Sequence, residues 1–105
     1  MTAYEEKKPH EWKEDFLNTI DEIVATGSIT RDEADLLEDS FRGMYHYIVK
    51  HKSPAFTKYM QICNDFDKTI KLLEETGGIS WLHYNALVDS FVAIADYVYN
   101  RKMVE

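Results

Sequence analysis

The sequence predicts an all-α protein, an antiparallel four-helix bundle built from two similar αα-hairpins. Four segments carry apolar residues at helical spacing, and no segment alternates apolar and polar residues as a strand does. The phrase at residues 25–41 returns at residues 75–91, as ATGSITRDEADLLEDSF and ETGGISWLHYNALVDSF. Short links between amphipathic helices favour an up-and-down bundle.

An offset of fifty residues aligns 15–52 with 65–102 without gaps. Thirteen of these 38 positions are identical, whereas average composition gives about two or three identities by chance. We interpret the match as an internal duplication, with one hairpin over about 9–52 and the other over about 54–102; two unrelated amphipathic hairpins remain the alternative. The length of 105 residues predicts one domain over 1–105.

The first hairpin is expected to contain helices over 9–26 and 31–51. Pro9 suits the first turn of a helix, because its missing N–H has no partner there. The first apolar stripe is Trp12, Phe16, Ile20 and Ile23, and the second is Ala34, Leu37, Phe41, Met44 and Ile48.

The second hairpin is expected to contain helices over 54–75 and 81–102. Ser53 followed by Pro54 has the pattern of an N-cap and a first helical residue. The two apolar stripes are Phe56, Tyr59, Cys63, Phe66, Ile70 and Leu73, and then Tyr84, Leu87, Phe91, Ile94 and Val98.

The repeated phrase predicts where one helix ends and the next begins. Gly27 and Gly77 stand where φ becomes positive after a helix, a conformation that glycine adopts without steric cost. Thr30 and Ser80 are expected to be N-caps. Glu33 completes a capping box in the first copy, and a histidine in that position removes it from the second.

Composition narrows the classes of function. The chain has 12 basic and 19 acidic residues and a formal net charge of −7, which disfavours nucleic acid as a partner. Its one cysteine excludes an internal disulfide and a CxxC motif. We find no phosphate-binding loop, HExxH or GxSxG motif, and expect no enzyme and no cofactor. The opening MTAYEEKKPHEW has no apolar core, and the longest apolar run is FVAIA, so a cytoplasmic protein without membrane contact is expected.

The histidines are the candidates for a metal or ligand site. His10 and Glu14 have i, i+4 spacing, but no histidine belongs to the ExxH motif of di-iron bundles. We expect no bound metal, and keep as an alternative a ligand- or metal-binding bundle with a polar site near His10, His46 and His51.

One flank of the last helix is apolar where the equivalent flank of 31–51 is charged. The candidate interface is Trp81, Val88, Val92, Ala95 and Tyr99, against Arg31, Glu38, Arg42, Tyr45 and Val49 in the first copy. An apolar strip on a surface helix requires a cover. A second copy is the first candidate, since most soluble oligomers are symmetric homodimers; residues 1–8 or a wide intramolecular contact are the alternatives.

Charged side chains form two further candidate surfaces. A basic–aromatic patch at one end of the bundle comprises Tyr45, His46, Lys50, His51, Lys52, Lys58, Arg101 and Lys102. Such mixtures suit acidic partners, although cations at helix C-termini also complement the helix dipole. An acidic patch comprises Asp32, Glu33, Asp35, Glu38 and Asp39.

These features favour a non-catalytic, acidic interaction protein that binds another macromolecule, with a protein as the expected partner. Small helical bundles serve as inhibitors, immunity proteins, antitoxins and small subunits, an analogy of fold alone. A further alternative is that the acidic patch mimics nucleic-acid phosphates and occupies a basic site.

Overall fold

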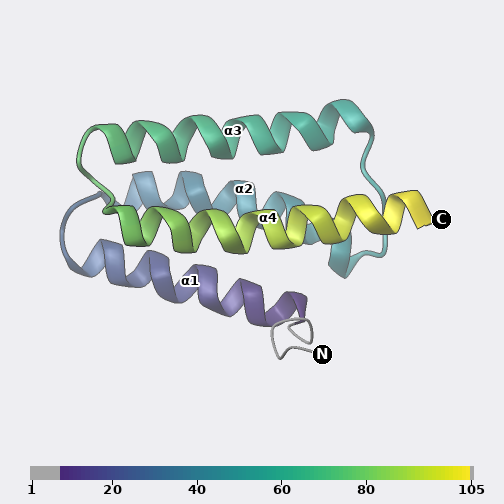
Figure 1. Ribbon diagram of the computed structural model, residues 1–105, viewed down its shortest axis with the longest axis horizontal. Helices are drawn as coiled ribbons and strands as arrows, with labels where there is room; N and C mark the ends of the chain where they lie inside the picture. The colour runs from purple at the N-terminus through teal and green to yellow at the C-terminus, as the bar shows by residue number, and fades with distance from the viewer. Residues whose placement is uncertain (1–7, 105) are drawn as a thin grey trace.

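The computed structural model describes the backbone of residues 8–104 and the side chains of residues 8–100. Its elements are α1 (Pro9–Ala25), α2 (Arg31–Val49), α3 (Phe56–Glu75) and α4 (Trp81–Val104). The described chain contains no strand, so the all-α prediction is confirmed. Figure 1 shows the helices lying alongside one another, with the connecting loops at the two ends of the long axis.

The helix starts follow their capping side chains in two cases. At α2 the Glu33 N–H donates to Thr30 Oγ1 at 3.1 Å, and the Thr30 N–H donates to Glu33 Oε1 at 2.8 Å. At α4 the His83 N–H donates to Ser80 Oγ at 3.2 Å. The His83 ring also lies 3.3 Å from Glu22 Oε1, measured from Nε2. His83 therefore connects the first turn of α4 to α1.

The predicted start of α3 is wrong. The helix begins at Phe56, with Ala55 in the extended conformation as its N-cap, and Pro54 is buried in the preceding loop. Phe56 is consequently 58% exposed and does not join the core. Ile62 is buried on α3 instead, because the helix packs on α2 at that position.

Two glycine turns bring the α1–α2 and α3–α4 loops together. Gly27 and Gly77 have φ values of 77° and 83°, as their positions after α1 and α3 predict. A Cβ at Gly78 would lie 2.9 Å from Ile29 Cγ2. The two loops are therefore in contact, and Ile29 and Ile79 are buried there.

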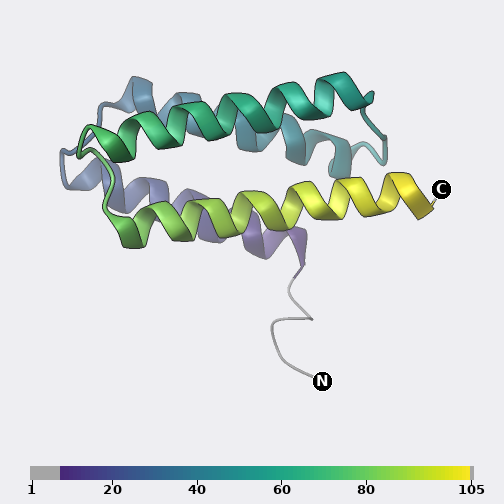
Figure 2. The same ribbon diagram turned by 45° about the horizontal axis from the view of Figure 1, so that its top comes forward.

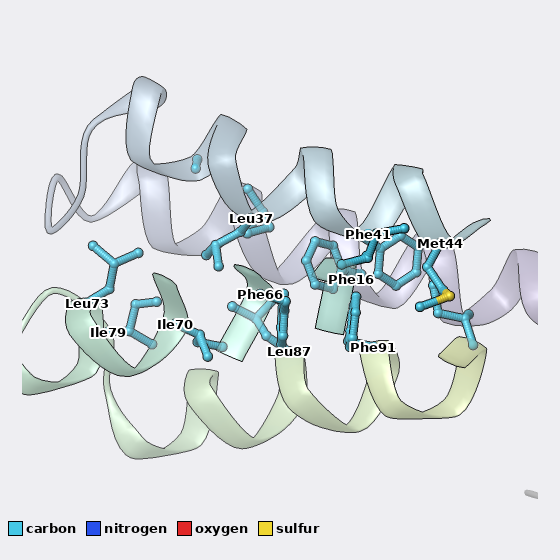
Figure 3. Packing of buried hydrophobic residues seen from close by; sticks show 14 of the residues in the cluster. Phe16, Leu37, Phe41, Met44, Phe66, Ile70, Leu73, Ile79, Leu87 and Phe91 are labelled. Atoms are coloured by element: carbon cyan, nitrogen blue, oxygen red, sulfur yellow. The ribbon is translucent and has the colours of Figure 1, made fainter. Parts of the chain in front are cut away.

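The core contains four phenylalanines, one from each helix. Phe16 and Phe41 stack with ring centroids 4.2 Å apart, and Phe66 and Phe91 stack at 4.1 Å with nearly parallel planes. Phe16 and Phe66 join these pairs at 6.1 Å. Figure 3 shows them among the surrounding aliphatic side chains, including Leu37, Met44, Ile70 and Leu87.

The helices do not pack equally closely. α1 packs most extensively on α4, and α2 packs on α3, so the closest pairs join one hairpin to the other. A Cβ at Gly43 of α2 would lie 3.7 Å from Ile62 Cδ1 of α3, which shows how near those two helices come. α3 and α4 share little contact, and this side of the bundle is less tightly closed.

Alanine at either turn glycine should destabilise the fold. Gly27→Ala and Gly77→Ala meet no neighbouring atom but place alanine at positive φ, so each should cost about 1 kcal/mol of unfolding free energy. Gly43→Ala is the control inside α2 and should stabilise by up to about 1 kcal/mol. Urea unfolding measures all three, and a neutral result at both turns would contradict the positive-φ assignment.

Removal of a core phenylalanine should be far more damaging. Phe41 and Phe91 are almost wholly buried, so Phe41→Ala or Phe91→Ala should each cost about 3–5 kcal/mol. Phe56→Ala, at an exposed phenylalanine, should cost less than about 1 kcal/mol. Thermal and urea unfolding test the difference, and equal losses at all three positions would overturn the core assignment.

Candidate functional site

A groove lies between α3 and α4, on the side where the two helices share little contact. It has a volume of about 350 Å³. Its apolar lining consists mainly of Tyr59, Cys63 and Phe66 from α3, and Val88, Phe91 and Val92 from α4. Figure 2 shows α3 and α4 together on one side of the molecule, in front of α1 and α2. We call this surface the α3–α4 groove.

Side-chain size explains why the groove is not filled. Phe66 and Phe91 stack face to face at its floor, with ring centroids 4.1 Å apart. Above them the facing positions carry short side chains, Cys63 on α3 and Val88 and Val92 on α4. Larger residues at these positions would occupy the space between the helices.

The structure brings most of the predicted α4 interface to this groove. Val88 is half-buried and Val92 is 46% exposed. Trp81 is 65% exposed and stacks on Tyr84, a groove residue, with ring centroids 5.7 Å apart. Ala95 also lines the groove, but it is only 5% exposed and belongs to the core.

The α3 side of the groove escaped the sequence analysis, which assigned Tyr59 and Cys63 to the core. Both are half-buried and line the groove. The Tyr59 hydroxyl donates to the Ala95 carbonyl oxygen at 3.1 Å, and its ring lies 5.8 Å from that of Tyr99. Tyr99, the last residue of the predicted interface, therefore flanks one end of the groove.

The charges that line the groove are negative. Among its described lining residues, Asp67 and Asp96 are charged and no cation is present. Asp67 forms an exposed ion pair with Lys71 at 3.2 Å. Burial raises the pKa of the Cys63 thiol, and the charge of Asp96 raises it further. The groove thus combines an apolar floor with an acidic rim.

The corresponding flank of the first hairpin is covered by charged side chains. Arg31 Nη2 donates to Glu38 Oε2 at 2.7 Å, and Arg42 Nη2 lies 3.2 Å from Glu38 Oε1. Lys13 Nζ lies 5.1 Å from the centre of the Tyr45 ring. The sequence placed Glu38 in an acidic surface patch, but this residue is only 5% exposed. Two arginines satisfy its charge.

The acidic patch is therefore smaller than the sequence suggested. Glu33 accepts the Thr30 N–H, and Asp35 lies 3.1 Å from Arg31 Nε. Asp32 and Asp39 are exposed. Much of the negative charge on this face of α2 is engaged within the helix.

The basic–aromatic patch is only partly described. The exposed members are His46, Lys50, His51, Lys52 and Lys58, whereas Tyr45 is half-buried. The side chains of Arg101 and Lys102 lie outside the described residues. His51 has a positive φ of 53° at the end of α2. His46 and Lys58 share a shallow depression with Asp39 and Asp65, so positive charge there is mixed with negative.

Two depressions contain residues that the offset of fifty relates. Asp15, Asp89 and Ser90 line one between α1 and α4, and Asp65, Asp39 and Ser40 line the other between α2 and α3. Sequence analysis matched these residues but did not place a carboxylate of one hairpin beside a carboxylate of the other. The offset of fifty relates these residues in the sequence, but only the packing of α1 on α4 and of α2 on α3 brings them to the same depressions.

Neither a metal centre nor a membrane segment is found in the described chain. Residues 8–100 contain no group of three or more His, Cys, Asp or Glu side chains arranged to hold a metal ion. His10, His46 and His51 are exposed. None of the four described helices has both the length and the apolar character needed to cross a bilayer.

Comparison of the chain with protein-family models, with curated proteins and with solved structures finds no match. Function must therefore be inferred from the chain's own surface. The α3–α4 groove is the strongest candidate, because it alone among the depressions described here has a mainly aromatic and aliphatic lining.

The titration of Tyr59 should report the groove environment. Burial is the main cause that raises the Tyr59 pKa to about 12, and the charges of Cys63 and Asp96 contribute. Because this folded-state pKa exceeds the unfolded value of about 10, the stability from the neutral phenol is complete below about pH 10 and is lost as pH rises through 12. Phenolate absorbance of the wild type should show a step near pH 12.

Tyr59→Phe should lose this high-pH step, and the exposed Tyr97→Phe control should keep it. Circular dichroism at each pH confirms that the protein is still folded when the phenol ionises. If Tyr59→Phe retains the step, the groove does not shield this side chain as the structure indicates.

Proposed function

We propose that the protein is a non-catalytic interaction protein that binds another protein through the α3–α4 groove. The observation that carries this proposal is the apolar lining of a groove on the less tightly packed side of the bundle, with Trp81 and Val92 exposed beside it. Contiguous exposed apolar surface is typical of interaction sites. Grooves between helices commonly receive a helix from a partner.

The groove residues support binding in preference to catalysis. A nucleophilic cysteine requires a lowered pKa, whereas burial raises the pKa of Cys63. The Tyr59 hydroxyl is engaged by the Ala95 carbonyl, and its pKa is raised to about 12. Both groups are therefore neutral near pH 7 and contribute polarity and shape. A reduced, cytoplasmic setting is part of the proposal, since the lone cysteine has no partner for an internal disulfide.

We also propose that the two halves are antiparallel hairpins of common origin. Support comes from the positive φ of both Gly27 and Gly77. It comes equally from the matched helix pairs, α1 with α4 and α2 with α3, which an exchange of the two hairpins would interchange. On this proposal the second hairpin has exchanged the charged cover of the first for an apolar groove.

A second copy of the chain is the first partner to test, because symmetric homodimers are the commonest assemblies. The other candidate partner is a different protein, as would be the case for an inhibitor, an immunity protein, an antitoxin or a small subunit. Both use the same surface, so one substitution examines both.

Val92→Arg should abolish binding without unfolding the protein. Arg42 occupies the related position in α2, where the structure accommodates it, and Val92 is already half-exposed. An unpaired arginine in an apolar interface costs binding free energy because the charge is desolvated. Light scattering at micromolar concentration measures the mass of wild type and variant, and circular dichroism measures folding.

Val49→Arg is the matched control, the same change at an exposed valine of α2 outside the groove. A dimeric wild type that becomes monomeric only with Val92→Arg supports self-association. If the wild type is monomeric, affinity capture from the source cells should recover a partner that Val92→Arg loses and Val49→Arg keeps. A partner retained equally by all three proteins would refute the proposed function.

A further inference from the structure

We propose that the α3–α4 groove receives one amphipathic helix of a different protein, with lysine or arginine residues flanking its apolar face. This inference rests on the proposed function and specifies the partner. It follows from the groove's length, from the sign of the charges at its rim, and from the manner in which the first hairpin covers the same surface.

The groove has the dimensions of a helix-binding site. Its lining extends from Tyr84 to Asp96 on α4 and from Tyr59 to Asp67 on α3. At 1.5 Å per residue, the α4 side is about 18 Å long, or about three helical turns. A partner helix of three to four turns can place apolar side chains at i, i+3 or i+4, and i+7 over the stacked Phe66 and Phe91.

The rim selects the charge of the partner. Asp67 and Asp96 are the charged residues that line the groove, one on each helix. Burial is the main cause that raises the pKa of both Tyr59 and Cys63, and the charge of Asp96, which lines the same groove, adds to it. Asp67 already pairs with Lys71 of its own helix at 3.2 Å. A cation beside the apolar face of the incoming helix would therefore meet the Asp96 carboxylate on one side and the exposed Asp67–Lys71 pair on the other, and an acidic residue would be repelled by Asp96.

The first hairpin shows the complementary arrangement within one chain. There Arg31 and Arg42 cover the flank of α2 by binding the buried Glu38. The related positions in α4 carry Trp81, Val92 and Val88, and no arginine. Because Val88 stands where Glu38 does, this flank of α4 has no buried carboxylate for an arginine to bind and stays apolar. The apolar face of a partner helix would cover it.

A second copy of the chain fits this rim poorly. A symmetric contact through the groove would bring Asp67 and Asp96 of each copy toward the other copy. Each chain also carries a formal net charge of −7. Like charges across an interface oppose association unless cations lie between them. The charge pattern therefore favours a basic partner.

Cys63 allows a direct test, because it lines the groove and is the chain's one cysteine. The rate of its reaction with a thiol reagent at mildly alkaline pH reports whether the groove is occupied. The probe is a synthetic helical peptide of four turns, with leucines on one face and lysines on the other. One comparison peptide replaces every lysine with glutamate, and another has the same leucines and lysines in scrambled order.

The lysine peptide should protect Cys63, and the glutamate and scrambled peptides should not. The double variant Asp67→Asn, Asp96→Asn should raise the peptide concentration for half-protection about tenfold, since both carboxylates of the rim lose their charge. The matched control Asp21→Asn, Asp39→Asn removes the same charge from exposed sites outside the groove and should leave that concentration nearly unchanged. Circular dichroism verifies that both variants fold.

Three results would overturn the inference. If both double variants weaken peptide binding equally, the peptide is attracted only by the net charge of the protein. Protection of Cys63 by increasing protein concentration without peptide, with a dimer in light scattering, would make a second copy the occupant and leave the proposed function intact. Failure of the lysine peptide to protect Cys63, while a cellular partner still depends on Val92, would mean that the partner has different chemistry. Loss of that dependence as well would refute the proposed function itself.

Discussion

The stacking of four phenylalanines fixes how the helices are arranged. Phe16 with Phe41 and Phe66 with Phe91 form two stacks that meet at the centre of the core. Each stack joins the two helices of one hairpin, while the closest backbone packing joins helices of different hairpins. The Phe66–Phe91 stack lies between α3 and α4, which share little other contact, whereas α2 and α3 pack extensively. The α3–α4 groove therefore results from the same contacts that stabilise the bundle.

The related flanks of α2 and α4 differ in polarity. In the first hairpin Glu38 is buried with two arginines, which satisfy its charge and cover the side chains beneath. A buried ion pair adds little net stability, because desolvation offsets most of the attraction. Here the ion pairs keep that flank of α2 polar. Val88 and Val92 leave the second flank apolar and available.

Local rules predicted local features well. Gly27, Gly77 and Thr30 act as their positions indicated, because turn and cap chemistry depends on a few adjacent residues. The start of α3 was wrong, because burial of Pro54 outweighs the preference of proline for a first helical turn. Half of the candidate site was predictable from apolar positions on α4. Its α3 half was not, since half-burial of Cys63 depends on how far α3 stands from α4.

The residues of the candidate interface on α4 follow the same apolar pattern as the residues of the core. Val88 and Val92 continue the stripe that buries Phe91, so apolar pattern alone cannot separate the residues that pack inward from those that line a groove. Comparison with Glu38 and Arg42 separates them, because charge at the related positions marks where the surface begins. Ala95 lies one step further inward and is buried. On the proposed common origin of the two hairpins, positions where one hairpin is charged and the other apolar indicate candidate binding surface, and identical apolar positions indicate core.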